Sequence, residues 1–389
     1  MRRTSLVLAF LVLACRRDTP PPIAPTTTPP LALASPPTSP GSPSSPPLQP
    51  IEPDPTATAG ASAPLDEPEQ QRRLRGLAAL DAGRFDLARA EFAAILAVAP
   101  GNLGVKALLD AATTAMLAAQ DSAARSFANL RPTVLPAPPW RHTVVQPLTV
   151  PAGAPPRLVL VTKQTNGITD EAAWLQAHGL RLPEYEVPNP MRGQPGNLPP
   201  NLPPVFGNEL LIQAIAHPDH TILVYGPNYS LGRHLAVLDA SGQLLAFLDF
   251  SAYTLAPDNL AADLQFVDQS VQWAELADGV LYVSHGHRTY ARSSKGMNAY
   301  ITALDLASAE LRWRSEPLVA GAANFVLDGP VILSGYGFTA EPDHVVVLER
   351  RTGKTLSKTK VDSAPEYLFV QGRRLLVRTY DTNYEFDLR

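Results

Sequence analysis

His285 and His287, separated by one glycine, have a spacing that can seat a metal ion. Alternate side chains of a β-strand point to the same face, so both imidazoles would face one side and would need a third ligand nearby. The equivalent place in the following repeat, Gly335-Tyr-Gly337, carries no metal-binding side chain. We therefore expect an exposed polar pair, with the metal site kept as the weaker alternative.

Other groups of residues that could form a functional site have simpler, structural interpretations. His217-Pro-Asp-His220 aligns with the turns of neighbouring repeats, so we expect a turn. Gly335-Tyr-Gly-Phe338 lacks the strand-to-helix setting that a phosphate-binding loop requires. Several aromatic residues are expected mostly in the core, with the face of the folded domain as the alternative. They are Trp273, Tyr282, Tyr290, Tyr336 and Phe338.

Composition excludes several classes of protein. The chain has 389 residues, of which 17% are charged, and its formal net charge is −4. A nucleic-acid-binding protein that relies on phosphate contacts normally has a basic excess, so we expect no nucleic-acid partner. The single cysteine excludes an internal disulfide framework and any structural zinc site built from several thiolates.

That one cysteine, Cys15, lies at the end of a short apolar segment. Arg2 and Arg3 precede an apolar run, residues 6–13, which is too short to span a bilayer and is typical of a secretory signal. The segment ends Val-Leu-Ala-Cys and resembles the lipobox of bacterial lipoproteins. The resemblance implies a signal peptide over residues 1–14, lipidation of Cys15 and a membrane anchor. Arg16 then favours the outer membrane over the inner membrane. The alternative is a plain signal peptide with a chance cysteine.

Residues 15–66 form a proline-rich region, and the whole chain contains 41 prolines. The region has no aromatic residue and few large apolar ones, so burial cannot offset its ordering entropy. We predict a disordered linker that tethers the folded part to the membrane. A ligand for a proline-recognising domain is the alternative.

Residues 67–130 change to an Ala/Leu/Arg-rich composition with helical spacing. Helices are predicted over 69–81, 86–98 and 103 to about 117, followed by a looser stretch to Leu130. The first two resemble a tetratricopeptide (TPR) repeat. One and a half repeats are too few for a self-stable solenoid, so the unit should pack on the next domain or on a partner. A plain helical hairpin capping the next domain is the alternative. The matching positions are Gly76, Gly83, Phe85, Ala88, Phe92 and Pro100.

From residue 131 to 389, strand signals dominate. Apolar strands flank turns at 217–220, 278–279, 328–329 and 371–372, and each pair is predicted to be a hairpin. A third strand and an acidic turn follow the first three hairpins, and the last copy stops early. Four-stranded units repeated in this way are typical of a β-propeller.

The acidic turns resemble the pyrroloquinoline-quinone-type (PQQ-like) propeller repeat. The matching positions are Asp239, Gly242, Asp305, Trp313, Glu349 and Gly353. The predicted fold class is therefore mainly β, a small propeller of about five blades, with four or six possible, after a TPR-like unit and a disordered linker. We expect a strand at 143–148 to complete the last blade, and strands at 158–162 and 180–187 to begin the first.

The quinoprotein relatives of this repeat hold a quinone and a calcium ion and commonly carry a vicinal cysteine pair. This chain has one cysteine, which the lipobox uses. We therefore predict no cofactor and no catalytic residues. The predicted function is a non-catalytic scaffold of the cell envelope, which binds a protein or ligand through its propeller and its TPR-like unit. The alternative is a propeller-type hydrolase or lyase in the periplasm or at the cell surface.

Overall fold

The structure, a computed structural model, describes residues 65–165, 171–194 and 196–389. The predicted signal peptide, the predicted lipidation site Cys15 and nearly all of the predicted linker lie outside these residues. The described chain is mainly β, as predicted, with a helical segment before the sheets.

Three helices form the first part of the described chain: α1 (Glu67–Asp81), α2 (Phe85–Val98) and α3 (Leu103–Phe127). Gly76 of α1 lies directly against the ring of Phe92, where any larger side chain would collide. Gly83 turns the chain between α1 and α2 with a φ of 71°. Ala88 is fully buried, Phe85 is half-buried, and Pro100 is exposed after α2. These contacts build a helical hairpin, and its TPR character stays a prediction.

Helix α3 is longer than predicted. It continues without a break through the Ala-rich stretch 118–126, where we expected a looser segment. Phe127 is buried in a cluster with Leu198 and Leu202, and the amide of Gln120 donates to the carbonyl of Leu198 at 3.3 Å. Because alanine favours helix and Phe127 is anchored among strand residues, the helix extends as far as the sheets. The helical unit thus packs on the next domain, one of the two arrangements expected.

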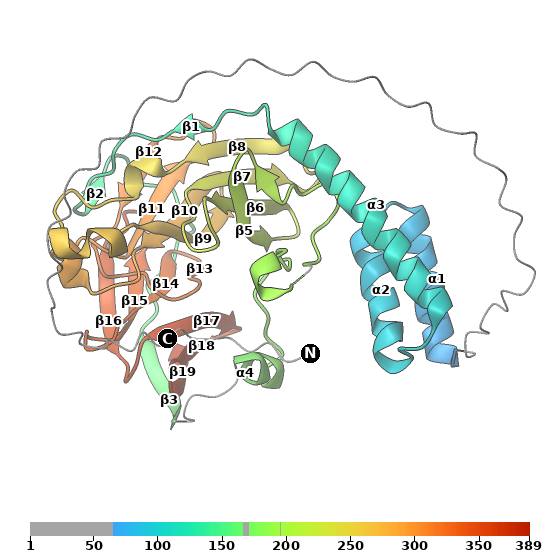
Figure 1. The fold of residues 1–389 in the computed structure, drawn as a ribbon. Coiled ribbons are helices and arrows are strands. Elements are labelled where there is room, and N and C mark those ends of the chain that lie inside the picture. The colour runs from blue at the N-terminus through green and yellow to red at the C-terminus, as the bar shows by residue number, and fades with distance from the viewer. Residues whose placement is uncertain (1–64, 166–170, 195) are drawn as a thin grey trace, which may run out of the picture. The chain divides into compact units, whose positions relative to one another are not determined.

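Four mainly antiparallel sheets follow, called blades 1 to 4 (Figure 1), and in blade 1 the short strand β4 (Val205–Phe206) pairs with β5. In each blade the strands run in chain order from the inner edge to the outer edge. Blade 1 contains β5 (Glu209–Ala216), β6 (His220–Gly226), β7 (His234–Asp239) and β8 (Leu244–Asp249). Blade 2 contains β9 (Ser270–Ala277), β10 (Val280–Gly286), β11 (Tyr300–Asp305) and β12 (Leu311–Arg314). Blade 3 contains β13 (Val326–Asp328), β14 (Val331–Tyr336), β15 (His344–Glu349) and β16 (Thr355–Lys360). Blade 4 contains β17 (Pro365–Gln371), β18 (Arg374–Thr379) and β19 (Thr382–Leu388).

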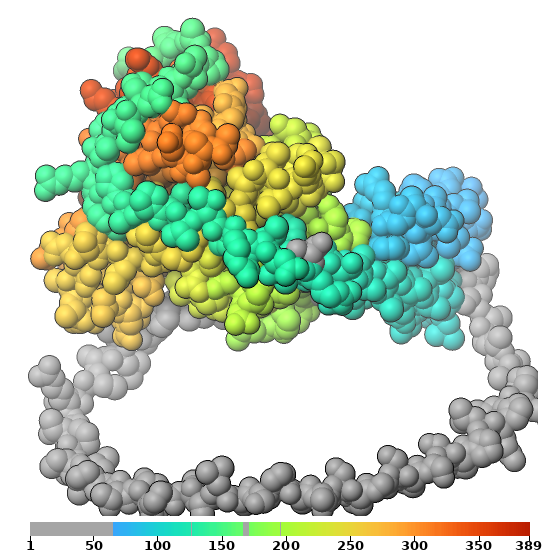
Figure 2. Space-filling view, turned by 90° about the horizontal axis from the view of Figure 1, so that it is seen from above, coloured from blue at the N-terminus to red at the C-terminus, as the bar shows by residue number. Residues whose placement is uncertain are grey.

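One extended segment, residues 131–165, reaches all four blades, and we call it the belt. Its short strand β1 (Thr133–Val134) pairs with β8, and β2 (Thr143–Val144) pairs with β12. The amide of Leu148 donates to the carbonyl of Arg351 beside blade 3 at 3.0 Å. Finally β3 (Leu158–Thr165) pairs along the whole of β19. Figure 2 shows the belt in teal and green running over the surface of the sheets. The belt therefore covers strand edges that would otherwise offer unpaired N–H and C=O groups.

The number of blades corrects two of our strand assignments. The strand that completes blade 4 is β3, whereas we expected residues 143–148. Those residues instead contribute β2 to the outer edge of blade 2. No separate first blade forms from residues 158–162 and 180–187. The described chain thus contains four blades, within the expected range of four to six but below the central expectation of five.

Residues 171–187 link the last blade to the first. Trp174 of α4 (Glu171–Ala177) contacts the ring of Phe369 on β17, with 6.1 Å between ring centroids. Glu184 forms an isolated bridge with Ile215 on β5, beside Pro183. Proline cannot donate a backbone hydrogen bond, which explains why this piece adds a single bridge rather than a strand.

The core is formed by the inner faces of the blades. One cluster joins blades 1, 2 and 3 and includes Val224, Trp273 and Ile332, and a second joins blades 3 and 4. The predicted hairpins and third strands all occur where the apolar runs placed them.

In the acidic turns of the repeat, an acidic side chain accepts backbone hydrogen bonds, and a glycine adopts a positive φ. The Oδ1 of Asp239 accepts the backbone N–H groups of Ser241 and Gln243 at 2.8 and 2.9 Å. Gly242 has a φ of 83°, a conformation that glycine adopts without strain. In blade 2 the matching position is Ala309, and it also has a positive φ, of 57°.

The other repeat positions have similar local partners. Asp305 accepts the N–H of Ser308 at 3.0 Å, and Glu349 accepts the hydroxyl of Thr352. Trp313 is fully buried, and its ring covers Gly353 in the turn of blade 3. Its Nε1–H donates to the carbonyl of Arg350 at 3.1 Å, so this tryptophan fastens blade 2 to blade 3.

Candidate functional site

The two ends of the blades differ in the length of their connections. At one end, the turn end, the first strand of each blade joins the second and the third joins the fourth by tight turns, such as 217–219, 278–279 and 240–243. At the opposite end, the loop end, lie longer connections, including 250–269, 287–299 and 315–325. Binding residues concentrate on loops that a rigid scaffold positions, so we sought a site at the loop end.

The longest of these connections, residues 250–269, is held by many hydrogen bonds. It contains the short 3-10 helices η2 (Ser251–Tyr253) and η3 (Ala261–Phe266). The amide of Leu260 donates to the carbonyl of Ser293 at 2.8 Å, and the hydroxyl of Ser293 donates to Asp263 at 2.8 Å. Ser293 belongs to η4 (Ala291–Ser294) in the neighbouring loop, so the two loops brace each other.

Four large apolar side chains of loop 250–269 face solvent. Their exposed fractions are between 40% and 52%. They are Leu255, Leu260, Leu264 and Phe266. Single exposed apolar residues are ordinary, but a group on one braced loop is typical of a surface that contacts another molecule.

The two predicted metal-ligand candidates lie next to this loop, and our expectation that they are exposed is wrong. His285 and His287 are both buried, because β10 is a central strand and its loop folds back under η4. The Nε2 of His287 lies 2.7 Å from the hydroxyl of Ser294, and its own backbone N–H donates to the side chain of Asn298. Burial lowers the pKa of His287 to about 4. It is therefore neutral at physiological pH.

His285 has different surroundings. Its Nε2 lies 3.2 Å from the hydroxyl of Thr302, while its Nδ1 is buried with no hydrogen-bond partner among the described residues. Burial, together with the nearby charge of Arg314, holds the pKa of His285 well below its usual range. The two imidazoles share no partner. Within the described ranges, no group of three His, Cys, Asp or Glu residues is arranged to hold a metal ion.

Arg314 is a candidate site residue that our sequence reasoning missed. It ends β12 and is completely buried, yet its three guanidinium nitrogens have no hydrogen-bond acceptor among the residues that the structure describes. Its Cζ lies 4.0 Å from the ring centroid of Tyr300, 5.1 Å from that of Tyr253 and 5.0 Å from that of Trp140. An arginine beside the motif residue Trp313, at the end of a strand, was the only available signal in the sequence.

The turn end contains the second histidine grouping. His217 and His220 form the predicted turn between β5 and β6, where the amide of His217 donates to the carbonyl of His220 at 2.9 Å. Their rings stack with 4.6 Å between centroids, and the Nε2 of His217 lies 3.2 Å from the Oε2 of Glu275 in blade 2. This contact with Glu275 raises the pKa of His217. This arrangement joins blades 1 and 2.

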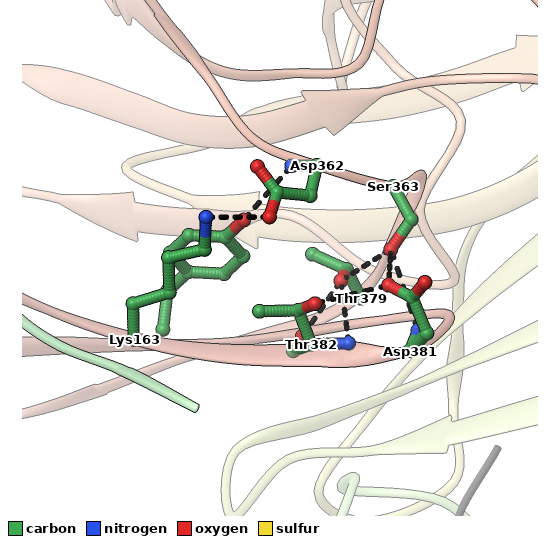
Figure 3. A network of polar contacts seen from close by, with 7 residues as sticks. Lys163, Asp362, Ser363, Thr379, Asp381 and Thr382 are labelled. Carbon is green, nitrogen blue, oxygen red and sulfur yellow. Dashed lines mark hydrogen bonds and ion pairs between the residues drawn. The ribbon is translucent and has the colours of Figure 1, made fainter. Parts of the chain in front are cut away.

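A polar network fastens the belt to blade 4 at the loop end (Figure 3). The Nζ of Lys163 on β3 lies 2.5 Å from Asp362, whose backbone N–H donates to the hydroxyl of Tyr384 at 2.8 Å. Beside it, the hydroxyl of Ser363 lies 2.7 Å from that of Thr379. These contacts join the closing strand β3 to the connection that precedes β17.

The predicted core aromatic residues mostly lie where expected. Trp273, Tyr282 and Tyr336 are buried. Tyr290 and Phe338 are half-buried, and their rings meet edge to face at 5.1 Å on the loop end. They extend the aromatic character of this end toward blade 3.

No protein-family model matches the chain, and no curated protein matches it. Solved structures show partial likeness. The computationally designed Ika4 protein is 12% identical, covering 44% of this chain and 85% of its own, with a TM-score of 0.28. BamB from Moraxella catarrhalis is 13% identical, and the match covers 48% of this chain and 72% of BamB, with a TM-score of 0.24. Glutaminyl cyclase from Myxococcus xanthus is 10% identical, and the match covers 61% of this chain and 100% of the cyclase, with a TM-score of 0.31. Because these scores are below 0.5, the fold class rests on the four sheets themselves, which define a small β-propeller.

Within the described residues, no helix is both long enough and apolar enough to cross a membrane.

Proposed function

We propose that the protein is a lipid-anchored, non-catalytic scaffold of the cell envelope, which binds an envelope protein through the loop end of its propeller. One observation carries the proposal. Leu255, Leu260, Leu264 and Phe266 expose apolar surface on a loop that is already braced by the neighbouring loop. Full burial of such a side chain contributes about 1.5–3 kcal/mol. A braced loop loses little conformational entropy on binding, so more of this energy is available as affinity.

The anchor in this proposal is the lipid on Cys15, which follows from the signal-like segment of the sequence. Several acyl chains on one residue give stable membrane attachment without a spanning helix. Arg16 favours the outer membrane over the inner membrane for this anchor, and in the proposal the proline-rich residues 16–66 separate the anchor from the folded part. The propeller would then meet its partner away from the bilayer surface.

The helical unit offers a second contact surface. Exposed apolar side chains occur on all three helices, with exposed fractions up to 67%. They are Leu74, Leu87, Val98, Leu103 and Leu117. In this proposal the TPR-like unit adds contacts to the same assembly.

Among the described residues, nothing favours the alternative of a hydrolase or lyase. His285 and His287, whose spacing first suggested chemistry, are buried and have separate hydrogen-bonding partners, Thr302 and Ser294.

The proposal is tested by purifying the tagged full-length protein from membranes under mild detergent. The double variant Leu264→Ser/Phe266→Ser removes loop-end apolar surface, and Leu245→Ser/Leu356→Ser removes comparably exposed residues of the outer strands β8 and β16. We expect a stoichiometric partner with the wild type and with the outer-strand variant. Its recovery should fall about tenfold or more with the loop-end variant. Equal recovery with both variants, or no stoichiometric partner with the wild type, would contradict the proposal.

A further inference from the structure

Arg314 is a buried cation with no anionic partner among the residues that the structure describes. Its side chain is fully buried, and within the described ranges the groups that favour its charge are Tyr253 and Tyr300, neither of them a carboxylate. Burial lowers the pKa of Arg314 to about 10, so the guanidinium remains charged at neutral pH. Burial of a charge is costly unless the charge is paired and hydrogen-bonded.

The surrounding rings compensate for only part of this cost. Trp140, Tyr253 and Tyr300 present aromatic rings within 4.0 to 5.1 Å of Cζ, and ring faces attract a cation. The guanidinium also has five N–H donors arranged in one plane, and these need oxygen acceptors. None of its three nitrogens has an acceptor among the described residues. The arrangement leaves a planar set of donors unused.

A second buried nitrogen with no partner in the described part of the chain lies beside the first, and it is a donor in the tautomer whose Nε2 accepts the Thr302 hydroxyl. The Nδ1 of His285 is buried and has no partner among the described residues, while its Nε2 faces the hydroxyl of Thr302. Thr302 is the register partner of Arg314 across β11 and β12. The ring of His285 also contacts the same two aromatic rings. Its centroid lies 5.2 Å from that of Tyr253 and 6.4 Å from that of Tyr300. Arg314 and His285 therefore occupy one aromatic-walled compartment.

Trp140 separates this compartment from solvent. It belongs to the belt, and its backbone carbonyl accepts the hydroxyl of Tyr300 at 2.9 Å. The same tryptophan lines a surface hollow of about 520 Å³, together with Arg141, Glu316, and the ion pair between Lys295 and Asp258, whose Nζ and Oδ1 lie 2.6 Å apart. A single half-buried side chain thus lies between the buried guanidinium and an open hollow whose rim carries both basic and acidic groups.

We propose that Arg314 and His285 form a binding site for one carboxylate group, carried by a small molecule that enters from the hollow when Trp140 moves aside. A carboxylate matches the guanidinium because its two oxygens accept two parallel N–H bonds. The site has one permanent positive charge, which suits a monoanion. The aromatic walls suit an apolar substituent on the carboxylate. This site is separate from the proposed partner surface, and either can fail without the other.

The first test measures thermal unfolding of the purified full-length protein in acetate at constant ionic strength, with the sodium salt of HEPES as the balancing salt. We expect acetate to raise the Tm of the wild type by roughly 2–5 °C at saturating concentration. Chloride should raise it less. An equal or larger response to chloride would overturn the carboxylate assignment.

Arg314→Met is the decisive variant, because it keeps the approximate length of the side chain and removes the charge. Replacing a buried unpaired charge with an apolar residue is expected to be neutral or stabilising. In acetate-free buffer its Tm should therefore equal or exceed that of the wild type, and acetate should have no effect. A lower Tm, or a retained response to acetate, would overturn the proposal.

Trp140→Ala tests the route of entry. Saturation-transfer NMR on the methyl protons of acetate should show binding to the wild type and at least equal binding to Trp140→Ala, with none to Arg314→Met. Loss of acetate binding in Trp140→Ala, or its persistence in Arg314→Met, would contradict the arrangement proposed here.

Discussion

The two ends of the propeller differ in which side chains they bury and which they expose. At the turn end, Asp239 and Gly353 have roles that follow from backbone geometry, and Trp313 locks one blade onto the next. At the loop end, long connections bury polar groups such as His287 and Arg314 and leave apolar groups such as Phe266 exposed. This reversal of the usual pattern separates the structural end from the end we propose for binding.

The largest expected effect comes from the turn end. Trp313→Ala removes a fully buried indole and its hydrogen bond to Arg350. Substitutions of this kind typically cost about 3–5 kcal/mol of the free energy of unfolding. Urea unfolding measures this loss. Leu356→Ala, at an exposed position of β16, is the matched control and should change stability by about 0.5 kcal/mol or less. A comparable loss in both variants would break the distinction drawn between the ends.

A second effect depends on pH and belongs to the loop end. The pKa of His287 is about 4 in the folded protein, below its ordinary value of 6.5, because the imidazole is buried. A depressed pKa favours the neutral form, so its stabilisation is present above pH 6.5 and is lost as pH falls toward 4. After allowance for solvent screening, we expect about 2 kcal/mol to be lost over this window.

Hydrogen exchange locates that loss. Amides of residues 287–299 should exchange faster at pH 4.5 than at pH 7, after correction for intrinsic rates, while those of the turn at 278–279 should not. In His287→Gln the additional acid sensitivity should be smaller. Uniform acceleration at both ends would contradict a local origin at His287.

A smaller effect of opposite sign is expected at the turn end. The contact with Glu275 raises the pKa of His217 above its ordinary value of 6.5. The stabilisation is therefore fully present below pH 6.5 and is lost as pH rises through the raised pKa. His217→Gln should lower stability at pH 6 and leave it nearly unchanged at pH 9, as measured by urea unfolding. A constant difference between variant and wild type across this range would exclude the ion pair as its source.

Local sequence patterns predicted the repeated parts of the molecule well. The hairpins around 278–279 and 328–329 follow from turn chemistry and apolar runs, both of which act over a few residues. The closing strand was assigned wrongly, because residues 158–165 pair with a strand more than two hundred residues away. Nothing local distinguishes Leu158 from a residue that begins a new blade.

The candidate sites show the same limit. The spacing of His285 and His287 drew attention to the correct region, but burial and separate partners depend on loops that fold over them. Arg314 was missed because its compartment combines Trp140 from the belt with Tyr253 from loop 250–269 and Tyr300 from β11. Such a convergence is a property of the tertiary fold and leaves no spacing signal in the sequence.

The central claim, that the loop end is the contact surface, is tested most directly by photo-cross-linking in intact cells. A photoreactive phenylalanine analogue replaces either Phe266 at the loop end or Leu356 on the outer strand β16, both of which are exposed. The account predicts a discrete protein adduct from position 266 and none from position 356. An adduct from position 356 alone, or none from either position, would contradict it.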